Sequence, residues 1–97
     1  MELTKELILT TIKKNKRKLS EHNVKKIGLF GSFVKEQQKS TSDIDILIEF
    51  TKVNIDKYLY VLNLLEKLFN KKVDLVIEKN LKPELKYVIK EAEYVKI

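Results

Sequence analysis

The residues that could do chemistry gather between positions 27 and 50. An apolar run ends at Gly31-Ser32, and Asp43 follows Ser32 by eleven positions, with Asp45 close behind it. Gly31 can take backbone angles closed to other residues, so the chain can turn there and present backbone amides together with the Ser32 hydroxyl. If a short helix follows, these donors stand at its N-terminus. Such an arrangement is suited to binding a phosphate.

Asp43 and Asp45 begin a segment with the alternation of a β-strand. From Ile44 to Phe50 every second residue is isoleucine or phenylalanine, which predicts a strand with one buried face. The two carboxylates then lie side by side on the other face. Because they repel each other, they favour a divalent cation with oxygen ligands, Mg²⁺ above all. A phosphate cradle beside a carboxylate pair predicts metal-assisted phosphate chemistry.

The order and spacing of these residues resemble the signature of the polymerase-beta-like nucleotidyltransferase superfamily, and the length is similar to that of its minimal nucleotidyltransferase branch. The resemblance covers essentially the whole chain. It implies an α/β fold with a small mixed sheet and helices packed on one face. It also implies transfer of AMP from ATP to a hydroxyl group with two Mg²⁺ ions. In this superfamily a neighbouring strand supplies a third carboxylate, and Asp74 stands where that residue is expected.

The resemblance also implies the roles of individual residues. Three aspartates are expected to be both catalytic residues and metal ligands, namely Asp43, Asp45 and Asp74. Three residues around the turn are expected to bind the nucleotide, namely Gly31, Ser32 and Lys35. Many members have an arginine near the position of Lys35, which is a point charge without the planar fork of arginine. Members of the minimal branch often act as antitoxins of HEPN-domain ribonuclease toxins, so a tyrosine of such a toxin is the expected acceptor.

Other interpretations stay open. A Gly-Ser pair is most often only a turn, and an aspartate in a strand is most often a surface residue; order, spacing and strand context together favour the enzyme. One rival is an antitoxin that only binds and blocks its partner. Another is a nucleic-acid-binding module, suggested by the net charge of +6. The lysines are scattered and lack interleaved aromatic residues, so we expect a solvated surface that attracts nucleoside triphosphates rather than nucleic acid.

Composition narrows the class of protein. The 97 residues predict one domain, from residue 1 to 97. No cysteine is present, which excludes disulfides and thiolate metal sites. No stretch resembles a signal peptide or is apolar for long enough to span a membrane, so we expect a cytoplasmic protein.

The expected elements alternate between helix and strand. An amphipathic helix capped by Thr4 should run to about Leu19, followed by a strand from Val24 to Phe30. After the strand of Asp43 and Asp45, we expect a helix from 55 to 69 and the strand of Asp74. The last helix should begin at Pro83 and pack through Val95, among other residues. The helix at 55–69 is apolar on two sides, which indicates either deep burial or contact with a partner or a second copy.

Overall fold

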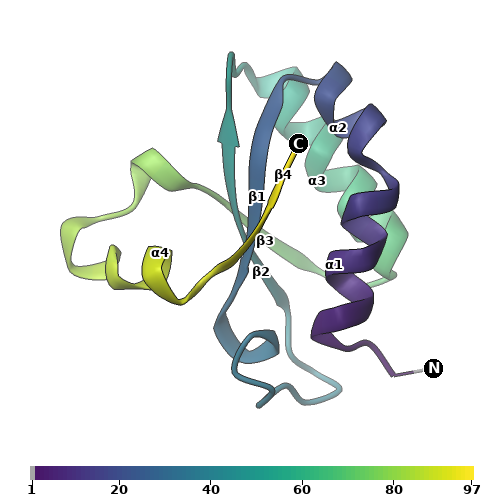
Figure 1. The fold of residues 1–97 in the computed structure, drawn as a ribbon, viewed down its shortest axis with the longest axis vertical. Coiled ribbons are helices and arrows are strands. Elements are labelled where there is room, and N and C mark those ends of the chain that lie inside the picture. The colour runs from purple at the N-terminus through teal and green to yellow at the C-terminus, as the bar shows by residue number, and fades with distance from the viewer. Residues whose placement is uncertain (1) are drawn as a thin grey trace.

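In the computed structural model, which describes residues 2–97, four strands form one mixed sheet in the order β3-β2-β1-β4 (Figure 1). β1 (Val24–Phe30) lies antiparallel to both β2 (Ile44–Phe50) and β4 (Glu93–Lys96). β2 lies parallel to β3 (Val73–Ile77). The expected mixed sheet is therefore confirmed, and β2 stands in its middle beside the strand of Asp74.

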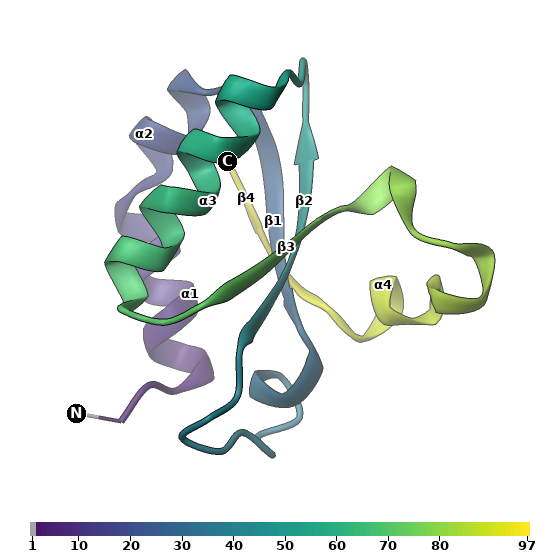
Figure 2. The same ribbon diagram turned by 180° about the vertical axis from the view of Figure 1, so that it is seen from behind.

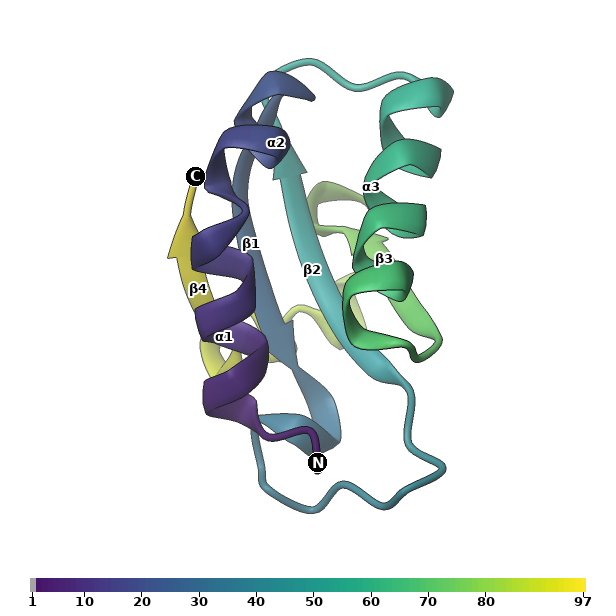
Figure 3. The ribbon, with the colours of Figure 1, turned by 90° about the vertical axis from the view of Figure 1, so that its right-hand side faces the viewer.

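Three helices cover one face of the sheet, namely α1 (Lys5–Lys14), α2 (Lys16–Glu21) and α3 (Ile55–Phe69) (Figure 3). The alternating isoleucines of β2 point toward them and are fully buried, as the pattern predicted. They pack in one apolar cluster with residues of the helices, among them Ile8, Ile12, Val61 and Leu65. No helix in the described part of the chain is long and apolar enough to cross a membrane.

The prediction of one helix from Thr4 to Leu19 was wrong, because the helix is interrupted at Asn15. Thr4 does cap α1, since its hydroxyl oxygen accepts a hydrogen bond from the Leu7 amide at 3.2 Å. At Asn15 the side-chain amide donates to the carbonyl of Thr11 at 2.8 Å. An asparagine that bonds the backbone in this way competes with helix continuation. α1 therefore ends there, and α2 begins at the next residue.

The prediction of a final helix from Pro83 through Val95 was also wrong. Short 3₁₀ helices (Glu78–Asn80 and Pro83–Leu85) lead to α4 (Tyr87–Glu91), and Val95 is buried in β4. The edge of β1 that does not pair with β2 has main-chain hydrogen-bonding groups, which β4 pairs with and which a helix at these residues would leave unpaired. Tyr94 of β4 also lies on Gly28 of β1, where a β-carbon would stand only 2.6 Å from a ring carbon. The glycine makes room for the ring and hence for the fourth strand.

The segment from β3 to β4, including α4, lies on the face opposite α1–α3 (Figure 2). Tyr94 donates a hydrogen bond to the Glu78 carboxylate, and the Lys26 ammonium lies 4.4 Å from the centre of its ring. Leu47, on this same face, is fully buried. Part of this second face is therefore covered, whereas Asp74 at the start of β3 is exposed.

Candidate active site

Asp45 and Asp74 stand directly opposite each other on the parallel strands β2 and β3. Asp45 alternates with the buried residues Ile44 and Ile46, so its side chain belongs to the face away from the three helices. Neighbouring strands lie about 4.8 Å apart. Asp43 comes one residue before β2 and two before Asp45, toward the same end of the sheet. The fold thus brings Asp74 close to Asp43 and Asp45, from which it is 31 and 29 positions away in the sequence.

The charges of these aspartates act on one another. Burial raises the pKa of Asp45 above its ordinary value of 3.8, and the nearby carboxylates of Asp74 and Asp43 raise this pKa further. Among residues 2–97, no salt bridge joins any of the three to a lysine or arginine. The three carboxylates therefore form an acidic group without a cationic partner, in a chain whose net charge is +6.

Gly31 lies against Asp45. Its φ angle is +76°, in the region that favours glycine, and a β-carbon at this position would collide with a carboxylate oxygen of Asp45. Phe30, the last residue of β1, is the register partner of Asp45. The sequence predicted the turn at Gly31 from the residue type alone. Its second role, close contact with Asp45, arises from the pairing of β1 with β2.

Ser32 follows in a 3₁₀ helix, Gly31–Phe33, which Phe33 anchors in the core. The sequence left open whether a short helix follows the turn, and the structure has one. Its first residue, Gly31, lies against Asp45, so the turn is beside the acidic group, where a phosphate site next to metal ligands is expected.

Lys35 is held on the other side of the turn. Its ammonium nitrogen is 3.5 Å from a carboxylate oxygen of Glu91 at the end of α4, and both side chains are about half exposed. Sequence reasoning missed Glu91 because no periodicity connects residues that are 56 positions apart. The structure thus places Gly31 against Asp45, with Ser32 as the next residue of the turn, and it places Lys35 in contact with α4.

The three aspartates are of the residue type that binds a divalent metal ion, but their carboxylates do not surround a common point where an ion could sit. No group of three or more His, Cys, Asp or Glu side chains within residues 2–97 is positioned to hold an ion. Asp43 and Asp74 are exposed, so their side chains can turn, whereas Asp45 is half-buried against Gly31. Carboxylate oxygens are the ligands that Mg²⁺ prefers. Burial and the repulsion of the neighbouring carboxylates raise the pKa of Asp45, and a cation here would relieve the repulsion.

Comparisons with known proteins show the family and the fold of this chain. Residues 12–95 match the family described as Polymerase beta, Nucleotidyltransferase. A relative from Thermococcus cleftensis, named protein adenylyltransferase MntA, is 38% identical over 96 residues, which cover 96% of this chain and 97% of the relative.

Two solved structures share the fold. One, described as a minimal nucleotidyltransferase, has a TM-score of 0.81 at 24% identity and covers 95% of this chain and 96% of that chain. The other is a chain in the complex of a tri-AMPylated HEPN toxin from Shewanella oneidensis with an MNT antitoxin. It has a TM-score of 0.62 at 20% identity, covering 90% of this chain and 70% of that chain. The fold and the sequence match confirm the resemblance seen in the motif, and the chain belongs to the polymerase beta family of nucleotidyltransferases.

Proposed function

We propose that this nucleotidyltransferase is a protein adenylyltransferase that acts as an antitoxin. It transfers AMP from ATP to a tyrosine hydroxyl of a HEPN-type toxin and thereby silences that toxin. The name of the Thermococcus cleftensis relative supports the adenylyl group and the protein acceptor. The AMPylated HEPN toxin in complex with an MNT antitoxin supports the partner.

The observation that carries the proposal is the pairing of Asp45 with Asp74 beside the Gly31 turn. Burial raises the pKa of Asp45, and the neighbouring carboxylates raise it further. Without a cationic partner among the described residues, the group leaves negative charge to be neutralised. Metal ions that also bind phosphate oxygens would neutralise it. The turn beside them offers donors for the phosphates themselves.

The proposed reaction exchanges one phosphorus–oxygen bond for another. The acceptor oxygen attacks the α-phosphorus of ATP, the bond from that phosphorus to the β-bridging oxygen breaks, and pyrophosphate leaves. The Ser32 hydroxyl and neighbouring amides hold the terminal phosphates. Asp74 would take the proton of the acceptor hydroxyl, and its exposure on the edge strand β3 supports this role. Asp43, Asp45 and Asp74 would hold two Mg²⁺ ions, which would supply charge stabilisation to the attacking and leaving oxygens.

The test is to co-express the chain with a HEPN-domain protein encoded in the same genome and to measure the intact mass of that protein. We expect mass increases of whole AMP units with the wild-type chain and none with Asp45→Asn. The matched control is Glu21→Gln, which also removes one negative charge. Glu21 is exposed at the end of α2 and is not one of the proposed site residues, so this variant should transfer AMP normally. A HEPN protein of unchanged mass beside the wild-type chain would refute the transfer reaction.

The same co-expressing cells distinguish an antitoxin that acts as an enzyme from one that only binds its partner. If Asp45→Asn, without transferring AMP, still protects cells from the toxin as well as the wild type does, blocking is sufficient and the binding-only function is the better account. We expect protection to be lost instead, because the variant keeps the shape of the side chain and loses its charge.

A further inference from the structure

The turn at Gly31 has one cation of its own, and a carboxylate already binds it. Lys35 belongs to this turn, because its backbone amide donates to the carbonyl of Gly31 at 3.2 Å. Its ammonium nitrogen lies 3.5 Å from a carboxylate oxygen of Glu91. No other lysine or arginine is present between Gly31 and Gln38. The turn at which we place the phosphates of ATP is therefore tied to α4 through its single positive charge.

The contact between Lys35 and Glu91 is of a kind that can be exchanged. Their side chains are 50% and 41% exposed. An ion pair in contact with water contributes little to stability, because the solvent screens it and both side chains lose freedom when they pair. An ammonium group on a flexible four-carbon stem can also turn from one anion to another. Lys35 can therefore leave Glu91 at little cost when a more highly charged anion is bound nearby.

Glu91 lies in a segment that little else holds in place. It is the last of the five residues of α4. None of residues 78–92 is buried. Segments with few buried apolar contacts open locally more readily than the core does. Separation of Lys35 from Glu91 would therefore loosen α4 and leave the sheet intact.

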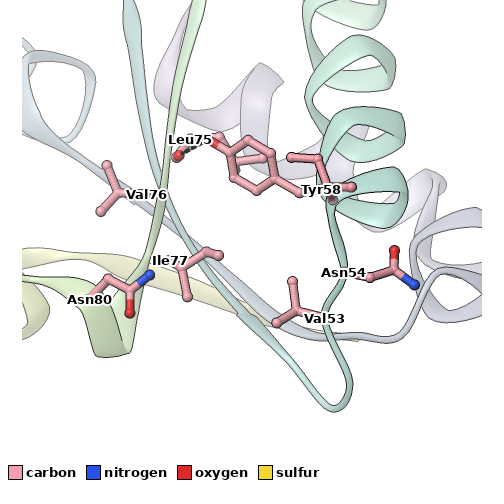
Figure 4. A pocket seen from close by; sticks show the side chains of 8 residues that line it. Val53, Asn54, Tyr58, Leu75, Val76, Ile77 and Asn80 are labelled. Atoms are coloured by element: carbon pink, nitrogen blue, oxygen red, sulfur yellow. Dashed lines mark hydrogen bonds between the residues drawn. The ribbon is translucent and has the colours of Figure 1, made fainter.

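The hollow between α3 and β3 offers a triphosphate no cation. Figure 4 shows the side chains that line it, which come from α3, β3, the loop before α3 and the segment after β3. No lysine or arginine is among these lining residues. Leu75, which lines the hollow, alternates with Asp74 along β3, so the two side chains belong to opposite faces of the sheet. The turn with Lys35, on the side of the acidic group, is the better site for the phosphates.

We propose that Glu91 is a positioning residue that lowers the affinity for ATP, because it competes with the triphosphate for the ammonium group of Lys35. Without nucleotide, Lys35 binds Glu91 and joins the turn to α4. With nucleotide, Lys35 binds a phosphate oxygen, and α4 loses this contact. A partner that must be given up reduces the apparent affinity of a ligand. The inference rests on the proposed function in one respect, which is that the turn at Gly31 binds the triphosphate.

The test is the variant Glu91→Gln, which keeps the size of the side chain and removes its charge. The dissociation constant of ATP in the presence of Mg²⁺ is measured by calorimetry on the purified chain. We expect this constant to fall by about two- to fivefold, which is the range that an exposed ion pair accounts for. The matched control is Glu84→Gln, which removes the same charge at an exposed position before α4 and should bind ATP like the wild type.

The sign of the effect distinguishes competition from support. If Glu91 instead held Lys35 in the position that ATP needs, Glu91→Gln would bind ATP more weakly than the wild type, and the proposal would be overturned. An unchanged dissociation constant would overturn it too. The same comparison in a Lys35→Met background identifies the residue through which Glu91 acts, since the gain should disappear there. A gain that persists without the ammonium group would mean that Glu91 repels the triphosphate directly, which also contradicts the proposal.

Hydrogen exchange follows α4 itself. Addition of ATP and Mg²⁺ to the wild type should accelerate the exchange of amides in 87–92, whereas β1 and β2 should keep their protection. In Glu91→Gln the exchange of these amides should be fast before ATP is added and should change little afterwards. Slower exchange of 87–92 in the wild type with ATP would show that the nucleotide tightens α4, and the proposal would then be wrong.

The roles of Glu91 and of AMP transfer can fail independently, because ATP binding is measured without an acceptor protein. A wild-type chain that binds ATP but leaves the HEPN protein unmodified refutes the transfer reaction alone. A wild-type chain that transfers AMP, with Glu91→Gln binding ATP no more tightly, refutes the role of Glu91 alone. A wild-type chain that binds no ATP refutes both.

Discussion

Asp45 is half-buried, with the turn at Gly31 packed against its carboxylate and Asp74 facing it across the sheet. Burial and two neighbouring negative charges all raise its pKa in the folded protein. The residue is therefore held in a position that is unfavourable for its own ionised form. In a nucleotidyltransferase such a residue is suited to binding a cation. Without the cation, its ionised form should lower the free energy of unfolding.

The first prediction concerns the stability of the metal-free protein. Because the folded state raises the pKa of Asp45 above 3.8, it binds the proton more tightly than the unfolded chain, and stability falls as the pH rises through the folded pKa. Asp45→Asn should therefore raise the free energy of unfolding at neutral pH by a few tenths to about 1 kcal/mol. The gain should vanish well below pH 3.8, where the wild-type carboxyl is protonated in both states.

Urea unfolding in the presence of a chelator, at neutral pH and well below pH 3.8, measures this difference. Asp56→Asn is the control of opposite sign, because Asp56 is in the first turn of α3 and its charge favours the helix N-terminus. A loss of stability in Asp45→Asn at neutral pH would contradict the assignment of mutual repulsion.

The second prediction concerns Gly31. Gly31→Ala should lower the free energy of unfolding by more than the cost of about 1 kcal/mol that a left-handed φ angle imposes on alanine. The excess comes from the collision of the new β-carbon with Asp45. Repeating the substitution in an Asp45→Ala background should remove the excess and leave the backbone cost. Equal losses in both backgrounds would show that the contact between the two residues is unimportant.

At the scale of elements, α3 supports β3, and its ends are well defined. The Asn54 side chain accepts a hydrogen bond from the Lys57 amide at 2.9 Å, and Asn70 ends the helix with a left-handed conformation. The Glu66 carboxylate accepts a bond from the Val73 amide at 3.0 Å, which ties the helix to the start of β3. The helix therefore contributes directly to where Asp74 lies.

The third prediction tests the cap of this helix. Asn54→Ala should lower the free energy of unfolding by about 1 kcal/mol, since the amide that it satisfies would be left without its partner. Asn63→Ala, on the exposed surface of the same helix, should be neutral or stabilising by a few tenths of a kcal/mol because alanine is the better helix former. Thermal unfolding of the two variants measures both effects, and a matching loss in the two would argue against the cap.

The fourth prediction concerns the segment that joins β3 to β4. Tyr94→Phe removes the hydroxyl that bonds the Glu78 carboxylate. Burial raises the pKa of Tyr94, and this hydrogen bond raises it further. We expect a loss in the free energy of unfolding of about 1.5–3 kcal/mol, typical of hydrogen bonds to charged groups. Hydrogen exchange of amides in 78–92 should accelerate relative to β1 and β2. Unchanged exchange in that segment would show that packing of the ring over Gly28 holds it without the hydroxyl.

At the scale of the whole molecule, the proposed function predicts stabilisation by nucleotide and metal together. A ligand at about 100 times its dissociation constant stabilises the folded state by about 2.7 kcal/mol, which should raise the melting temperature by more than about 10 °C in a chain of this length. Chelation of Mg²⁺ should abolish the rise, and so should Asp43→Ala combined with Asp45→Ala. An equal rise in that variant would place the nucleotide elsewhere.

The local pattern of apolar residues in the sequence was sufficient to predict most of the helices and strands. The bounds of β1 and α3 agree with the strand at 24–30 and the helix at 55–69 that were predicted from apolar periodicity. The face of Asp45 followed from the same alternation, because a period of two decides which side chains share a face wherever the strand lies in the sheet. The break at Asn15 and the strand β4 were missed, since side-chain bonds to the backbone and open sheet edges leave no periodic signal.

The motif itself, Gly31-Ser32 followed by Asp43 and Asp45, was determined by sequence alone, and it identified the family before any fold was known. Only the tertiary structure decided that Asp74 faces Asp45, that Gly31 packs against the same carboxylate, and that Lys35 contacts Glu91. The physical reason is that periodicity records whether a face is buried, and not what buries it. Contacts between residues distant in the chain depend on which strands pair and in which register, and the whole chain decides that together.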